Sequence, residues 1–212
     1  HIIDLNKTVA MIEDAAGAMK QIAKSGKKIL FVATKKQAKS IVAETAQSLN
    51  MPYITERWPG GLLTNFSTIR KSIKKMQVID KMKEDGTFAT LSKRERLQID
   101  RQRAKLELNL GSIVKMNRMP EAIFVVDINK ERIAVSEANH LGIRSFAMTD
   151  TNTNPKLIDF PIPANDDASK SIVCILSIIK QAISEGLEER SKEQLVKENE
   201  KKEKAKMISE KK

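Results

Sequence analysis

The sequence reads Ile29-Leu30-Phe31-Val32-Ala33 and then, after Thr-Lys-Lys, enters a helical pattern from Ala38 to Leu49. A continuous apolar run of this length is typical of a strand covered on both faces. Apolar residues spaced by three and four are typical of a helix with one buried side. The unit recurs, since Ala122-Ile123-Phe124-Val125-Val126 precedes a helical pattern from Ile133 to Leu141. Buried strands alternating with amphipathic helices predict an α/β fold, a parallel sheet with helices on both faces.

The remaining elements of this sheet follow from the same patterns. Helical spacing predicts a first helix from Val9 to Ala23 and a closing helix from Ala168 to Ile183. Asp166 or Asp167 stands where it can cap the closing helix and favour its N-terminal dipole. Short strands are expected at residues 53–54, 145–148 and 158–162.

Residues 66–118 interrupt the alternation of strands and helices. Helical spacing predicts one helix over 66–84, ended by Asp85-Gly86, and Ser92 with Glu95 forms a capping box that opens a second helix. In the second helix apolar residues recur every seven positions with one between, the pattern of a coiled-coil seam. The seam consists of Ile99, Leu106, Leu110 and Ile113. We expect an antiparallel coiled-coil hairpin inserted between residues 1–65 and 119–183, which form the α/β domain, with a charged extension at 184–212.

The positive charge of the chain is concentrated in this insertion. Residues 66–118 hold fourteen Lys and Arg against six Asp and Glu, a net charge of +8 out of +11 for the chain, whereas residues 119–183 hold six against eight. A solvated charged face is one interpretation. An RNA-binding face is the other, and we favour it because arginine forks match phosphate geometry. The predicted RNA-binding side chains of the hairpin are Arg70, Lys71, Lys74, Lys75, Arg94, Arg96, Arg101, Arg103 and Lys105.

The loop before the hairpin has an unusual composition, Arg57-Trp58-Pro59-Gly60-Gly61-Leu62-Leu63-Thr64-Asn65-Phe66. Gly60 and Gly61 permit a left-handed conformation or a close backbone approach, so we expect both to be structural. Thr64 or Asn65 can cap the helix that follows. Trp58 either plugs the base of the hairpin against the sheet or offers a stacking platform for a base. Together with Arg57 and Asn65, we include Trp58 among the candidate RNA contacts.

Other features of the sequence exclude several classes of protein. No apolar run reaches the roughly 20 residues of a membrane span, and no signal-peptide pattern opens the sequence. Cys174 is the only cysteine and two histidines occur. We therefore expect no internal disulfide, no zinc or other metal site, and a reducing, cytoplasmic compartment. The charged extension at 184–212 has no apolar face, so in isolation we expect it to be frayed or disordered and to be ordered by a partner.

Candidate chemistry at the strand ends is sparse. Thr34-Lys35-Lys36 opens a helix, where N–H groups can hold a phosphate, but no Gly-rich loop accompanies it. Asp127 and Asp150 follow predicted strands, where α/β enzymes keep catalytic carboxylates, although a structural loop or cap is the competing interpretation. No catalytic constellation assembles, so we expect no enzyme, no cofactor and no small-molecule substrate. A phosphate- or nucleotide-handling α/β enzyme is the alternative function, and a free RNA-binding regulator is a third.

Several short stretches of sequence between residue 1 and about residue 183 are, together and in this order, specific for one family. They are His1-Ile2-Ile3-Asp4-Leu5, Arg57 to Phe66, Pro120 to Asp127, Glu137-Ala138, Leu141-Gly142-Ile143, Asp150-Thr151-Asn152 and Pro161 to Ala168. In these stretches the chain closely resembles the bacterial ribosomal protein S2 family. The resemblance implies a flavodoxin-like sheet with an inserted coiled-coil hairpin. It also implies a non-enzymatic structural role in translation, in the small (30S) subunit of the cytoplasmic ribosome. The implied partners are 16S ribosomal RNA near the head–body junction and neighbouring small-subunit proteins, often including the large protein S1.

Overall fold

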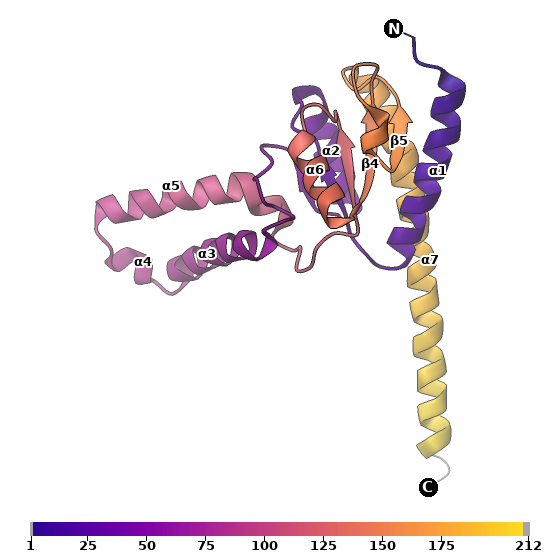
Figure 1. The fold of residues 1–212 in the computed structure, drawn as a ribbon. Coiled ribbons are helices and arrows are strands. Elements are labelled where there is room, and N and C mark those ends of the chain that lie inside the picture. Colours follow the sequence, from indigo (N-terminus) through magenta and orange to yellow (C-terminus); the bar gives the residue numbers. More distant parts are fainter. Residues whose placement is uncertain (1, 210–212) are drawn as a thin grey trace.

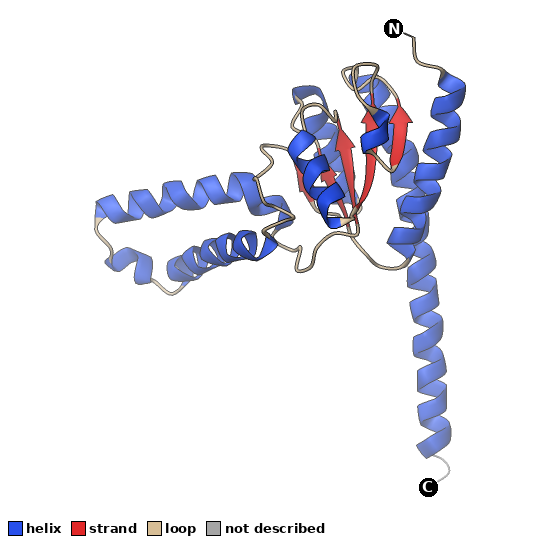
Figure 2. Cartoon of the chain, viewed as in Figure 1, coloured by secondary structure: helices blue, strands red, loops and turns tan. Residues whose placement is uncertain are grey.

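The computed structural model describes the backbone of residues 2–209 and the side chains of residues 2–196. Five strands form one sheet in the order β2-β1-β3-β4-β5, and every neighbouring pair is parallel (Figure 2). The predicted doubly wound, flavodoxin-like α/β fold is thereby confirmed. The strands are β1 (Ile29–Val32), β2 (Tyr53–Ile54), β3 (Ala122–Val126), β4 (Arg144–Thr149) and β5 (Phe160–Pro163).

Helices cover both faces of the sheet because successive side chains of a strand point to opposite sides. On β1, Phe31 packs into a core with α1 (Leu5–Lys24), α2 (Lys36–Ser48) and α7 (Ser169–Ser209). Leu30 and Val32 pack into a second core with α6 (Arg132–Leu141) and the loop that contains Trp58. The neighbouring strands β1 and β3 are buried along their whole length, as their continuous apolar runs predict.

An arm of two long helices projects from one side of the sheet (Figure 1). It consists of α3 (Phe66–Glu84), a one-turn helix α4 (Thr87–Thr90) and α5 (Lys93–Leu110). The predicted capping box opens α5, since Ser92 Oγ accepts from the Glu95 N–H at 3.3 Å and Glu95 Oε2 accepts from the Ser92 N–H at 3.0 Å. The short helix α4 was not predicted, because a single turn leaves no periodic signal.

The apolar seam of the arm differs from the heptad pattern in the sequence. Ile99 and Leu106 are only partly buried, and Ile113 lies in a 3₁₀ turn (Gly111–Ile113) beyond the end of α5. At its base the arm shares the second core, where Ile73, Leu110, Ile113 and Met116 pack with strand residues such as Ile123. The arm base therefore belongs to the core of the sheet domain.

The last helix also departs from expectation. The predicted helix ends at Ile183, but α7 continues unbroken through Ser209. Ion pairs with α1 support the continuation, because Lys20 Nζ lies 3.0 Å from a Glu185 oxygen and 2.9 Å from a Glu189 oxygen. The expected fraying from residue 184 is therefore not seen over residues 184–209, and residues 210–212 lie outside the described part of the chain. Of the helices in residues 2–209, none has the length and apolar character that a membrane crossing requires.

Candidate nucleic-acid interface

A buried carboxylate holds the loop that connects the sheet to the arm. Glu137, on α6, is 8% exposed, and its Oε1 accepts hydrogen bonds from Trp58 Nε1 at 3.1 Å and the Gly61 N–H at 2.8 Å. Its Oε2 accepts from the N–H groups of Leu63 at 2.9 Å and Thr64 at 3.1 Å. These four donors, together with the Thr64 hydroxyl, fix where the chain leaves the sheet.

The protonation of Glu137 follows from this environment. Burial raises the pKa of Glu137, but the hydrogen bonds from Trp58 and the loop N–H groups outweigh burial and hold the pKa below its ordinary value. The carboxylate is therefore charged at neutral pH. Sequence reasoning missed Glu137, although a signal existed: it lies between Ala134 and Ala138, both fully buried, on the inner side of the predicted helix.

The structure gives the other residues of this loop distinct places. Trp58 is 6% exposed, so its ring plugs the arm base and offers no surface on which a base could stack. Gly61 has a φ of 80°, which favours glycine, whereas Gly60 has neither a positive φ nor an atom within 4 Å of where a Cβ would stand. The structural role expected of both glycines therefore holds for the backbone conformation of Gly61 and is wrong for Gly60. Asn65 occupies the N-cap position of α3, but neither its side chain nor that of Thr64 caps the helix.

The carboxyl edge of the sheet holds a charge cluster centred on Lys35. Lys35 Nζ lies 3.1 Å from an Asp127 oxygen and 2.7 Å from oxygens of both Asp166 and Asp167. Burial lowers the pKa of Lys35, but these carboxylates outweigh burial and raise it well above its ordinary value. Asp166 and Asp167 thus pair with a lysine instead of capping α7. Asn165 Oδ1 accepts from the N–H groups of residues 167 and 168, in the turn that leads into α7.

This cluster bears on the enzyme alternative. It lies between β1 and β3, the switch point at which folds of this type bind ligands. Asp150, Asp166 and Asp167 bring carboxylate oxygens within 4.8 Å of one another, and the Lys35 ammonium already sits among them. Carboxylates at this density repel a phosphate, and Lys35 is engaged with three of them. The arrangement has the chemistry of a structural ion-pair network.

Of the nine candidate arm cations, two are engaged within the protein and a third is partly buried. Arg103 pairs with Asp80 and reaches a Glu107 oxygen at 3.6 Å, so its charge is balanced locally. Arg70 Nη1 donates to the Met116 carbonyl at 3.3 Å. Arg96 is partly buried, and its Nε has no hydrogen-bond partner among the described residues. These three side chains are poorer phosphate ligands than the sequence suggested.

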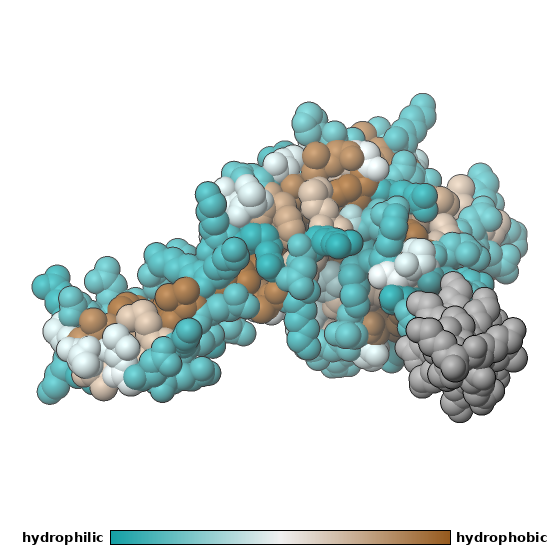
Figure 3. Space-filling view, turned by 90° about the horizontal axis from the view of Figure 1, so that it is seen from below, coloured by the Kyte–Doolittle hydropathy of each residue, from teal (hydrophilic) through white to brown (hydrophobic). Residues whose placement is uncertain are grey.

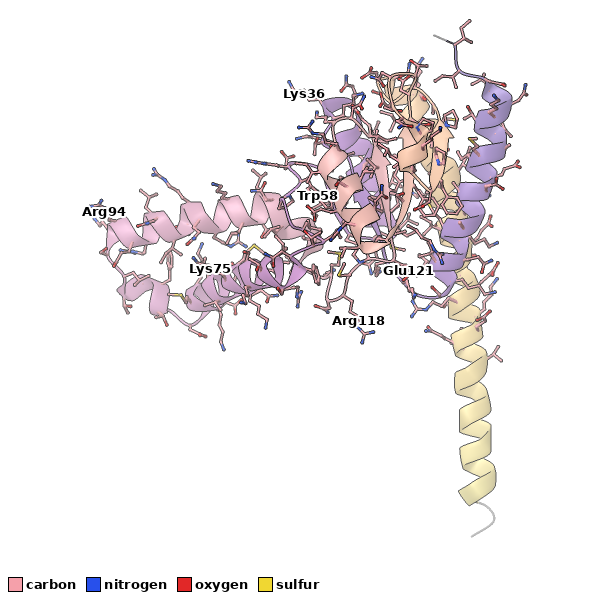
Figure 4. The ribbon with its side chains drawn as sticks, viewed as in Figure 1. Lys36, Trp58, Lys75, Arg94, Arg118 and Glu121 are labelled. Carbon is pink, nitrogen blue, oxygen red and sulfur yellow. The ribbon has the colours of Figure 1, made fainter. Side chains whose placement is uncertain are left out.

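The other candidate cations are solvent-exposed along both long helices of the arm. In the part of the chain with described side chains, none of them has a carboxylate within ion-pair distance. Figure 4 shows Lys75 on α3 and Arg94 near the tip of α5. The exposed set consists of Lys71, Lys74, Lys75, Arg94, Arg101 and Lys105.

A hollow at the base of the arm adds one loop residue to this set. Arg57 is exposed and, with Gly60 and Lys105, lines a cavity of about 370 Å³ between the loop and the arm helices. The structure therefore brings Arg57 close to Lys105 of the arm. Asn65 is exposed as well, one residue before α3.

Comparison with known proteins gives a consistent result. A family described as "Ribosomal protein S2" matches residues 1–186. The chain is similar to the small ribosomal subunit protein uS2 of Phocaeicola vulgatus, with 66% identity over 195 residues, 92% of this chain and 70% of that protein. It is also similar to uS2 of Flavobacterium johnsoniae, with 66% identity over 196 residues, 92% of this chain and 77% of that protein. For uS2 of Porphyromonas gingivalis the identity is 66% over 193 residues, 91% of this chain and 69% of that protein.

Proposed function

The chain belongs to the ribosomal protein S2 family, and from this premise we propose that its arm binds 16S ribosomal RNA near the head–body junction of the small subunit. Family membership makes it a structural protein of the small ribosomal subunit, and we propose that it has no enzymatic role. The RNA contact, its position in the subunit and the residues that make it are our proposal. The observation that carries the proposal is the row of exposed arm cations that have no carboxylate partner among the side chains of residues 2–196.

The proposed contacts are to phosphates and sugars. An exposed cation that is unpaired in the free protein gives up few interactions when it meets a phosphate, and counterions released from the RNA favour binding. Lys and Arg side chains on a helix reach the backbone of A-form RNA but not the base edges in its deep, narrow groove. The arm would then recognise the shape of the RNA, and the interface would consist of the exposed arm cations together with Arg57.

The division of the chain fits this assignment. We propose that residues 1–65 and 119–183 form the body, that residues 66–118 form the RNA-binding insertion, and that the extension beyond residue 184 meets neighbouring proteins of the small subunit. The resemblance adds protein S1 as a candidate neighbour. A free RNA-binding regulator of the same fold remains distinguishable, because it would not co-sediment with small subunits at high salt.

The experiment compares two full-length variants that lose the same charge. In the arm variant, three Lys and two Arg become Gln: Lys71, Lys74, Lys75, Arg94 and Arg101. We expect the slope of log K against log salt for 16S RNA to fall by roughly 4, because each lost phosphate contact removes about 0.7 to 0.9. We also expect the variant to co-sediment poorly with small subunits.

The control variant carries five Gln substitutions at exposed cations outside the arm: Lys36, Arg132, Arg144, Lys170 and Lys180. It should retain most of the slope of the unmodified chain. Equal slopes for the arm and control variants would contradict the assignment of RNA binding to the arm. As an internal comparison, Arg103→Gln should change the slope less than Lys74→Gln, because Asp80 already balances Arg103.

A further inference from the structure

A second group of cations lies where the strands of the sheet begin, at the edge opposite to the Lys35 cluster. We call it the basic edge patch, and it consists of Lys27, Lys28, Lys115, Arg118 and Arg190. These residues come from three separate parts of the chain: the loop before β1, the loop before β3, and α7. Because the members are scattered along the sequence, no charge run reveals them.

The patch is concave. Lys27, Lys28, Lys115 and Arg118 line one hollow of about 350 Å³. Lys28 and Lys115 also line a neighbouring hollow of about 200 Å³, so the two hollows share these lysines. Arg190 of α7 lies against Gly26, which lines the larger hollow. A Cβ added to Gly26 would stand 2.3 Å from the guanidinium carbon of Arg190.

Carboxylates leave most of this charge unbalanced. Glu121 is the acidic residue that lines the larger hollow, and it pairs with Lys27 at 2.7 Å. Two acidic side chains of α7 that flank Arg190 in the sequence, Glu189 and Glu193, pair with Lys24 at 3.0 and 3.1 Å. Among side chains of residues 2–196, ion-pair partners are absent for four members of the patch: Lys28, Lys115, Arg118 and Arg190.

Like charges in the patch also act on one another. Lys28 Nζ donates to the Asn50 carbonyl at 2.7 Å, which supplies no negative charge. Burial lowers the pKa of Lys28, and the positive charge of Arg190 lowers it further. Lys28 and Arg190 therefore repel each other in the free protein, and a bound anion would reduce this repulsion.

We propose that the basic edge patch is a second binding site for the phosphodiester backbone of RNA, separate from the arm helices. This inference rests on the proposed function and extends it to a surface outside the two long helices of the arm, although Lys115 and Arg118 count toward the net charge of residues 66–118. Each hollow is lined by lysine ammonium groups, and the larger one adds the Arg118 guanidinium and the Asn117 amide. Ammonium, guanidinium and amide groups donate hydrogen bonds to phosphate oxygens.

The position of the patch favours one continuous polyanion. Arg118 lies beneath the sheet between the arm and α7 (Figure 4), and the view from below shows hydrophilic side chains gathered there (Figure 3). An RNA segment that follows the arm to its base meets this corner next. An acidic peptide is the less favoured occupant, because the larger hollow lacks aromatic side chains and its apolar side chains are Met116, which is buried, and Met119.

The test uses the full chain carrying Lys28→Gln, Lys115→Gln and Arg118→Gln together. Lys27 stays unchanged because it pairs with Glu121. The matched control carries Lys36→Gln, Lys170→Gln and Arg132→Gln, which remove the same charge from exposed positions elsewhere. Binding to 16S RNA is measured over a range of salt, after circular dichroism has shown that both variants unfold at the temperature of the unmodified chain.

We expect the patch variant to lose roughly 2 to 3 from the salt slope and the control less than about 0.5. An unchanged slope, or an equal loss in both variants, would overturn the proposal. Unchanged RNA binding with loss of a neighbouring protein from reconstituted subunits would overturn it in favour of a protein partner. The arm variant tests the proposed function independently. If the patch variant binds RNA like the unmodified chain while the arm variant binds more weakly, the patch proposal is rejected and the proposed function is kept.

Discussion

The arm and the carboxyl edge of the sheet use lysine in opposite ways. At the sheet edge, Lys35 is 15% exposed and meets three carboxylates within 3.1 Å. On the arm, Lys74 and Lys75 are exposed and have no carboxylate partner within the described side chains. The first arrangement satisfies its charge inside the protein, whereas the second leaves its charge for a partner. Net charge counts both kinds of lysine equally, so it is the pairing that distinguishes a structural lysine from an interface lysine.

The base and the outer part of the arm differ in a related way. Ile73, Leu110, Ile113 and Met116 at the base pack with the sheet. Met76 and Ile79 further out are buried at 3% and 5% exposure but lie outside that core. The structural boundary of the sheet domain therefore runs across the arm, about two turns out from the start of α3.

The largest expected effect comes from moving a deletion across this boundary. Replacing residues 68–117 by a short Gly/Ser linker removes four side chains of the second core, each worth about 2–5 kcal/mol. We expect that protein to lose its cooperative unfolding transition. Replacing only residues 77–102 leaves the core intact, so this trimmed protein should unfold cooperatively near the temperature of the full chain while binding 16S RNA less tightly than the full chain, because it loses Arg94 and Arg101.

Thermal unfolding followed by circular dichroism measures both deletions. Cooperative unfolding of the 68–117 deletion at the temperature of the trimmed protein would show that the arm base contributes nothing to the core. Full RNA binding by the trimmed protein would show that the outer arm faces away from RNA.

The next largest effect concerns Glu137, the carboxylate that holds the loop between the sheet and the arm. Glu137→Ala leaves Trp58 Nε1 and the loop N–H groups without their acceptor, and we expect a loss of about 3–5 kcal/mol. Glu137→Gln keeps one acceptor oxygen, so its loss should be about 1.5–3 kcal/mol. Urea unfolding at pH 7 measures both, and a smaller loss for Ala than for Gln would contradict the role of Glu137 as an acceptor.

The same carboxylate predicts a pH dependence. Because folding holds the pKa of Glu137 below its ordinary value of 4.5, its contribution to stability is present above about pH 4.5 and is lost as the pH falls through the folded-state pKa. Glu137→Gln removes this ionisation. The difference in unfolding free energy between the unmodified chain and Glu137→Gln should therefore shrink on acidification from pH 5, and a constant difference would contradict the depressed pKa.

The sequence predicted the sheet well because its signals are local. The run at β3 predicts a strand over residues 122–126, which are its observed bounds, and the capping box of Ser92 and Glu95 is present. Both depend on neighbouring residues, so each can be recognised without knowing the rest of the fold. Asp85-Gly86 marks the end of α3 for the same reason.

The candidate site was harder to predict because its contacts join distant segments. Glu137 meets Trp58 across 79 positions, and Lys35 meets Asp166 across 131. The spacing within each segment carries no sign of these partners, so the sequence predicted Asp166 as a helix cap and left Trp58 open between a plug of the arm base and a stacking platform. Arg103 read as a free cation for the same reason, because Asp80 lies on the other helix of the arm.

The smallest effect tests the lysine comparison directly, with Lys35→Met beside Lys36→Met. Lys35→Met leaves Asp127, Asp166 and Asp167 without their cation, and we expect a loss of about 2 kcal/mol, less than for a fully buried pair. Lys36 is exposed and unpaired within the described side chains, so its replacement should cost under about 0.5 kcal/mol. The measurement is urea unfolding at several pH values.

The pH dependence of that comparison has a definite sign. The pKa of Lys35 is raised above 10.5, so Lys35 stays charged from pH 4 to pH 7 and any change over this range comes from the carboxylates. Burial raises the pKa of Asp166, and Lys35 partly offsets this rise while Asp127 and Asp150 add to it. Without Lys35 the rise is larger, and protonation relieves the repulsion among the carboxylates. The loss in Lys35→Met should therefore shrink as the pH falls from 7 to 4, while equal, pH-independent losses for both variants would show that Lys35 is no more structural than a surface lysine.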